Sequence, residues 1–145
     1  MHLVADIAVA LVALLHAYFL VLEMFLWDKP TGLRTFGHSA EHAAASKVLA
    51  ANQGLYNGFL AAGLVWGLTL GSAGTSVKVF FLVCVIVAGV YGAATAAKKI
   101  LFVQALPAAI ALAPSRFCST VWKIQSERRA VTITSTSAII RDDRG

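Results

Sequence analysis

Three long apolar runs constrain the fold of this chain more than any other feature of its sequence. The runs are Leu3–Trp27, Val48–Leu70 and Val77–Ala97. A helix of about 20 residues spans the roughly 30 Å of hydrocarbon in a bilayer, so each run is long enough to cross it. A fourth run, Ile100–Ala113, is shorter and contains Pro107. The pattern predicts an all-α integral membrane bundle of four transmembrane helices, of which the fourth either spans the bilayer or is re-entrant.

The composition excludes the soluble alternatives. Hydrophobic residues make up 59% of the 145 residues and charged residues 13%, whereas soluble domains hold about 45–50% and about 25%. So few charges cannot cover a small protein, whose surface is large for its volume. A soluble enzyme, a disordered chain and a nucleic-acid-binding domain are therefore excluded as first interpretations. We expect the lipid bilayer as a partner and no nucleic acid.

The two ends of the chain are predicted to differ. The first apolar run has no basic segment before it and is too long for a signal-peptide core, which predicts a retained transmembrane helix. After Pro114 the sequence becomes rich in Ser, Thr and Arg. We therefore divide the chain into a four-helix transmembrane domain, residues 1–113, and a polar, poorly ordered C-terminal tail, residues 114–145.

The charges between the apolar runs predict an orientation. The first and third loops share one side of the membrane and carry Lys29, Arg34, Lys47, Lys98 and Lys99. Lys78 lies on the other side, with the N-terminus. The positive-inside rule then places the first and third loops in the cytoplasm. The basic tail argues for the opposite orientation, and this conflict disappears if the fourth helix is re-entrant.

Polar side chains inside the apolar runs predict a site. His16 and Glu23 share one stripe of the first helix, at about 100° per residue, and ionisable groups within a span usually face the protein interior or a wet cavity. Because successive helices are antiparallel, the other polar side chains fall near the depth of Glu23, beneath the first and third loops. The candidates are His16, Glu23, Trp27, Asn52, Gln53, Tyr56, Asn57, Tyr91 and Gln104. The pattern is that of a half-membrane vestibule with His16 at its floor.

Simpler roles stay open for several of these side chains. The amides can hydrogen-bond across helices without binding a ligand, and tyrosines often anchor at the membrane interface. The second run also carries two glycine ladders on nearly opposite sides, Gly54/Gly58 and Gly63/Gly67/Gly71. Such ladders let backbones approach closely, so we expect this helix to be contacted on both sides and a homodimer to form through one ladder.

One motif suggests a metal site that the rest of the sequence does not support. His38, Glu41 and His42 match the pattern H-x-x-E-H, in which both histidines bind zinc. The motif falls in a short loop with no evident third ligand and no room for a protease domain. We therefore predict no metal site and no cofactor.

The amino-acid sequences of four segments resemble those of a known family. They are residues 22–27 (LEMFLW), 49–61 (LAANQGLYNGFLA), 87–92 (VAGVYG) and 100–107 (ILFVQALP). Over Leu11 to Leu112 the chain resembles small bacterial integral membrane proteins catalogued as a domain of unknown function, number 1304. The resemblance implies a four-helix protein of the bacterial plasma (inner) membrane and supplies no reaction, substrate or cofactor. Its signature positions are Glu23, Trp27, Asn52, Gln53, Tyr56, Asn57, Tyr91, Gln104 and Pro107, and the tail departs from its pattern.

These observations lead to one favoured function and two alternatives. The favoured one is a polar intramembrane pocket that binds or transports a small solute or lipid headgroup with proton linkage. Glu23 would be its proton-linked or cation-pairing group and His16 the deeper partner, with the amides as hydrogen-bonding groups and the aromatic side chains as walls. The first alternative is a cofactor-free intramembrane isomerase that acts on an apolar substrate. The second is an accessory or structural membrane subunit, and an enzyme is the less favoured class.

Overall fold

A computed structural model describes residues 2–113, and every regular element in that range is helical. The elements in chain order are α1 (His2–Phe25), α2 (Pro30–Phe36), α3 (Ala40–Thr69), the 3-10 turn η1 (Gly71–Gly74), α4 (Thr75–Thr95) and the π-helical turn η2 (Leu101–Ala105). The turn η2 begins the last helix, Leu101–Ala113. The all-α prediction is confirmed for the described residues. The predicted tail, residues 114–145, lies outside them.

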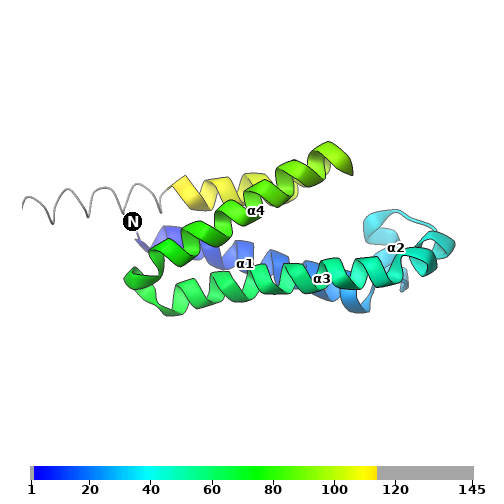
Figure 1. Ribbon diagram of the computed structural model, residues 1–145, viewed down its shortest axis with the longest axis horizontal. Helices are drawn as coiled ribbons and strands as arrows, with labels where there is room; N and C mark the ends of the chain where they lie inside the picture. Colours follow the sequence, from blue (N-terminus) through cyan, green and yellow to red (C-terminus); the bar gives the residue numbers. More distant parts are fainter. Residues whose placement is uncertain (1, 114–145) are drawn as a thin grey trace, which may run out of the picture.

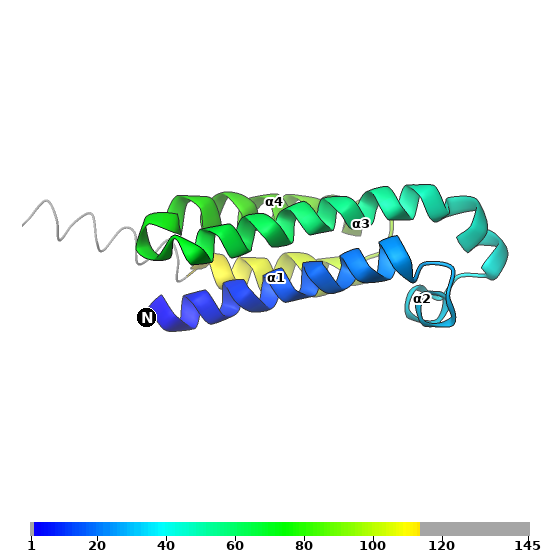
Figure 2. The same ribbon diagram turned by 90° about the horizontal axis from the view of Figure 1, so that it is seen from below.

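The helices form an elongated bundle. Helices α1 and α3 run antiparallel along its whole length and share its most extensive contact (Figures 1 and 2). Helix α4 returns alongside α3 from the turn η1, and the last helix packs against α4. Figure 1 shows α4 diverging from α3 toward its C-terminal end, and Figure 2 shows α2 across the end of α1.

The first predicted loop is more helical than expected, which corrects the boundary of the second helix. Helix α3 begins at Ala40 rather than Val48, and the short α2 precedes it. The Ser39 side chain caps α3 by accepting a hydrogen bond from the His42 backbone N–H, and Pro30 occupies the first position of α2, where its missing N–H is harmless. The prediction followed hydrophobicity, which begins only at Val48, so it overlooked the amphipathic first turns of α3.

Two segments are long and apolar enough to cross a membrane, judged by length and composition. They are Leu3–Phe25 and Gly71–Thr95. Helix α3 is longer than either but contains polar residues such as Asn52 and Asn57, and the last helix is a shorter apolar one. The four predicted spans therefore correspond to four helices, two of which have the length and apolarity of a membrane span.

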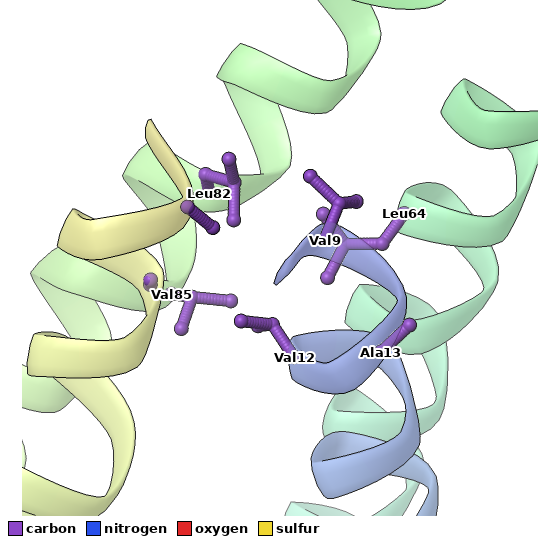
Figure 3. Packing of buried hydrophobic residues seen from close by; sticks show 8 residues of the cluster. Val9, Val12, Ala13, Leu64, Leu82 and Val85 are labelled. Carbon is purple, nitrogen blue, oxygen red and sulfur yellow. The ribbon is translucent and has the colours of Figure 1, made fainter. Parts of the chain in front are cut away.

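A buried apolar cluster fills the end of the bundle near the N-terminus. Figure 3 shows Val9, Val12, Leu64, Leu82 and Val85 converging from α1, α3 and α4, and each is at most 2% exposed. Small residues of the last helix complete the cluster. We call this end the apolar half.

An ion pair lies at the outer edge of the apolar half. Lys78 Nζ donates to Asp6 Oδ1 at 2.7 Å and to the Gly71 carbonyl at 3.3 Å. The Lys78 side chain is only 8% exposed, and its stem packs on Gly67. A contact 72 residues apart in the chain therefore joins the start of α1 to the start of α4.

The glycine ladders of α3 face two different neighbours within the chain. A Cβ on Gly54 would lie 3.0 Å from the Met24 nitrogen of α1, and one on Gly63 would collide with the Phe81 ring of α4. The prediction that this helix is contacted on both sides is confirmed. The homodimer stays an untested prediction. The ladder glycines within α3 already face α1 or α4, whereas a Cβ on Gly71, in η1, would meet nothing within 4 Å.

Candidate functional site

The buried stripes of three helices change from apolar to polar along the bundle. On α1 the stripe runs from Val12 through His16 to Glu23, and on α3 from Leu64 to Asn57. On the last helix it runs from Ala108 to Gln104. We call His16, Glu23, Asn57 and Gln104 the polar half. It lies toward α2, on the side of the first and third loops.

His16 and Gln104 form the deeper pair of the polar half. His16 is 0% exposed, and its Nδ1 lies 2.8 Å from the Val12 carbonyl oxygen. Because a carbonyl oxygen only accepts, Nδ1 carries the proton of the neutral ring and Nε2 is left as an acceptor. The Gln104 Nε2 lies 3.4 Å from His16 Nε2 and supplies the matching N–H. The pair links the middle of α1 to the last helix.

The π-helical turn η2 positions Gln104. Such turns are rare in proteins and often occur at functional sites. The turn lies against α4 at Gly89, where a Cβ would come within 2.8 Å of the Ala105 backbone nitrogen. Glycine at this position lets the last helix approach α4 closely enough for Gln104 to reach His16.

Glu23 and Asn57 form the second pair, about two helical turns from His16 along α1. Asn57 Nδ2 donates to Glu23 Oε2 at 2.7 Å, and both side chains are half-buried. Close packing at Gly54 brings α1 and α3 together at this level. The structure thus joins four of the nine candidate residues into two hydrogen-bonded pairs.

Four other candidates lie outside these pairs. The side chains of Asn52, Gln53, Tyr56 and Tyr91 are exposed, with Tyr56 at 56% and Tyr91 at 71%. Because Gly54 faces Met24 near the end of α1, Asn52 and Gln53 lie level with that end rather than deep in the bundle. Gln53 still shares a face with Asn57, one turn away, whereas Tyr91 lies on the divergent end of α4.

Trp27 belongs to an aromatic cap that sequence reasoning missed. Its indole Nε1 donates to Ser46 Oγ at 3.1 Å, and its ring centroid lies 4.8 Å from that of Phe36 and 4.3 Å from that of His38. A His38 ring nitrogen also lies 3.3 Å from the Trp27 carbonyl oxygen. The sequence signal that could have predicted this cap is the group of aromatic residues on both sides of Pro30, where α2 begins. The cap fixes α2 over the end of α1.

An exposed ion pair lies beside this cap. Lys47 Nζ donates to Asp28 Oδ2 at 2.7 Å, and Lys29 lies 3.9 Å from the other oxygen. The hydrogen bond from Lys47 lowers the pKa of Asp28 below its usual value, and the Lys29 charge adds to this. The pair ties the end of α1 to the first turns of α3.

Comparisons with known proteins agree with this helical arrangement and give the family. Over residues 2–113 the structure defines a small all-helical bundle with two apolar helices long enough to cross a membrane. A family model described as "Protein of unknown function (DUF1304)" matches residues 10–115, so the chain belongs to that family, as its sequence motifs predicted.

One curated relative supports the same assignment. It is a protein of Lactococcus lactis subsp. lactis (strain IL1403) named "Uncharacterized protein YpaA". The two are 36% identical over 109 residues, which cover 74% of this chain and 92% of the relative. No solved structure matches the chain significantly.

Proposed function

We propose that this chain is an integral membrane protein whose polar half binds a small polar molecule, either a solute or a lipid headgroup. The exposure of its apolar helices supports the membrane setting. Only 28% of the most apolar stretch of Leu3–Phe25 is buried within the bundle, and only 22% of the most apolar stretch of Gly71–Thr95. Large side chains such as Val4 (69% exposed) and Phe80 (62%) therefore face outward, and lipid is the surrounding that would cover them favourably.

The Glu23–Asn57 hydrogen bond is the observation that carries the binding role. A carboxylate within a membrane bundle is expensive and usually marks a functional site. If Glu23 and Asn57 served only to pack α1 against α3, two apolar side chains would do so equally well. The core side chains of the apolar half are almost completely buried, so this half leaves a ligand no path through the bundle. A ligand would reach the polar half from one side only, which favours binding over transport.

The charges of the described residues support an orientation with the first and third loops in the cytoplasm of a bacterial plasma (inner) membrane. The connections between α1 and α3 and between α4 and the last helix contain Lys29, Arg34, Lys98 and Lys99 against the single acidic residue Asp28. At the opposite end Lys78 is neutralised by Asp6. The excess positive charge therefore lies on the side of the polar half, where positive-inside orientation would place the cytoplasm.

A ligand screen with matched variants tests the binding role. Thermal unfolding of the full chain in nanodiscs would be measured with cationic, neutral and anionic small molecules, for wild type, Glu23→Gln and Asp28→Asn. We expect at least one ligand class to raise the unfolding midpoint of wild type and Asp28→Asn but not of Glu23→Gln. If no class does so, and Glu23→Gln only lowers stability, the polar half is structural and the accessory-subunit interpretation replaces this one.

A further inference from the structure

We propose that Glu23 and Asn57 bind a primary ammonium group, carried either by a free amine or by the ethanolamine headgroup of a phospholipid. The inference rests on the binding function proposed above and names the chemical class of its ligand. It follows from the charge of the site, its remaining hydrogen-bonding atoms and its depth in the bundle.

The charge of the site calls for a cation. Glu23 is the acidic member of the polar half, and Asn57 is its sole hydrogen-bond partner within residues 2–113. Over the same residues, the ion pairs involve the carboxylates of Asp6 and Asp28, and Glu23 has no basic partner. In its ionised form Glu23 favours a ligand that brings a positive charge and repels an anion.

The remaining acceptors of the site call for N–H donors. Asn57 uses one amide hydrogen on Glu23 Oε2, which leaves Glu23 Oε1 and Asn57 Oδ1 as acceptors. In the described chain, no fully buried side-chain nitrogen or oxygen lacks a partner, so neither of these two oxygens is completely enclosed by the bundle. A primary ammonium group has three N–H donors for such oxygens, and its charge strengthens each hydrogen bond.

The aromatic side chains near the site disfavour a quaternary ammonium ligand. Such a cation has no N–H donors and is usually recognised by aromatic faces around it. Trp27 is committed to the cap with Phe36 and His38, and Tyr56 is exposed on another face of α3. The acceptors of Glu23 and Asn57 are therefore the recognition elements, and they discriminate for N–H groups.

The depth of the site suits both sources of the ligand. Glu23 lies two residues before the end of α1 at Phe25, about 3 Å along the helix axis. In the proposed membrane setting this level lies just inside the hydrocarbon boundary, within reach of phospholipid headgroups and of an amine that arrives from water. Gln53 lies one turn closer to that end, on the face of Asn57, and its side chain is exposed.

The test compares ethanolamine with choline, which differ in the N–H donors of the ammonium group. Full-length protein in phosphatidylcholine nanodiscs would be titrated with each, and the unfolding midpoint recorded. We expect ethanolamine to raise the midpoint at concentrations at least tenfold lower than choline. Glu23→Gln should abolish the shift, and the matched carboxylate variant Asp28→Asn should retain it. A second arm of the experiment adds phosphatidylethanolamine to the nanodiscs. If only this lipid raises the unfolding midpoint, and only when Glu23 is present, the lipid is the source of the ammonium group.

A second variant keeps the inference falsifiable if Glu23→Gln does not fold. Asn57→Leu removes the amide and keeps the carboxylate, so it should reduce the preference for ethanolamine over choline to less than threefold. Equal binding of the two ligands by wild type would overturn the ammonium assignment and leave the binding function intact. If neither amine nor any other molecule of the screen shifts the unfolding midpoint, both the ammonium assignment and the binding function are overturned.

Discussion

The two halves of the bundle use the same helices and the same buried stripes in different ways. In the apolar half, Val9, Leu64 and Leu82 are completely buried and fill the space between α1, α3 and α4 by shape. In the polar half, the same stripes carry two hydrogen-bonded pairs, His16–Gln104 and Glu23–Asn57. Closely packed apolar side chains leave no space for a ligand, whereas the hydrogen-bonded Glu23–Asn57 pair leaves acceptor atoms that a ligand could use. In the proposed function, one half stabilises the bundle and the other binds the ligand.

The largest expected effect comes from the apolar half. Leu64→Ala removes a completely buried side chain and should lower the free energy of unfolding by about 2–5 kcal/mol, because the cavity left behind is only partly refilled. Leu49→Ala, the same change at a 68% exposed position of α3, is the control and should have little effect. Denaturant unfolding in detergent measures both. Equal effects would contradict the assignment of the core to this half.

The junction between α4 and the last helix should give the next largest effect. Gly89→Leu places a side chain against the Ala105 backbone, which cannot move aside as a flexible side chain could. Overpacking of this kind costs about 1–3 kcal/mol, and the displaced last helix should also take Gln104 away from His16. Unfolding measurements on Gly89→Leu and on the exposed neighbour Ala88→Leu test this. Matching stability of the two variants would argue against the close approach.

The deeper polar pair should contribute less. Gln104→Leu leaves the His16 Nε2 acceptor without its donor, and interhelical hydrogen bonds in membrane proteins contribute about 0.6–2 kcal/mol. A double-mutant cycle with His16→Leu should show coupling of that order. The exposed amide variant Gln53→Leu should show no coupling with His16→Leu. A coupling of zero between His16 and Gln104 would mean that the pair does not form.

The surface ion pair should give the smallest effect and a dependence on pH. Because Lys47 lowers the pKa of Asp28 in the folded chain, the unfolded chain binds a proton more readily, and the pair stabilises the fold above the ordinary Asp28 pKa of 3.8. This contribution is lost as pH falls through the lower, folded-state pKa. Asp28→Asn should therefore lower the unfolding midpoint slightly at pH 7, and the difference from wild type should vanish in acid. A constant difference would contradict the pairing.

Much of the fold could be predicted from the sequence, because hydrophobic length and polar spacing are local properties. The helices, the shared stripe of His16 and Glu23 and the two contacted faces of α3 all follow from such spacing. The start of α3 at Ala40 could not be predicted from hydrophobicity, since it depends on the Ser39 cap. The pairing of Asp6 with Lys78 was also missed, because it joins residues far apart in the chain.

The membership of the candidate site was harder to predict than its general position. Depth and helical phase grouped Glu23 with Asn57, and the structure joins the two by a hydrogen bond where their helices pack closely at Gly54. The same reasoning grouped Tyr56 and Tyr91 with them, yet both side chains are exposed. Helix phase gives the direction of a side chain but not whether a neighbouring helix lies there. The divergence of α4 from α3 (Figure 1) is a tertiary feature that the sequence pattern does not encode.

Thiol labelling along one face of α3 tests the difference between the two halves most directly. Single cysteines at Asn57 and Leu64, two turns apart on that face, would be placed in a background with Cys84 and Cys118 changed to serine. A water-soluble, membrane-impermeant thiol reagent would be applied to the folded protein in nanodiscs. We predict rapid labelling at position 57, where the polar half is open, and none at position 64 until the protein unfolds. Equal labelling at both positions, or labelling at position 64 alone, would contradict the division into a binding half and a sealed half.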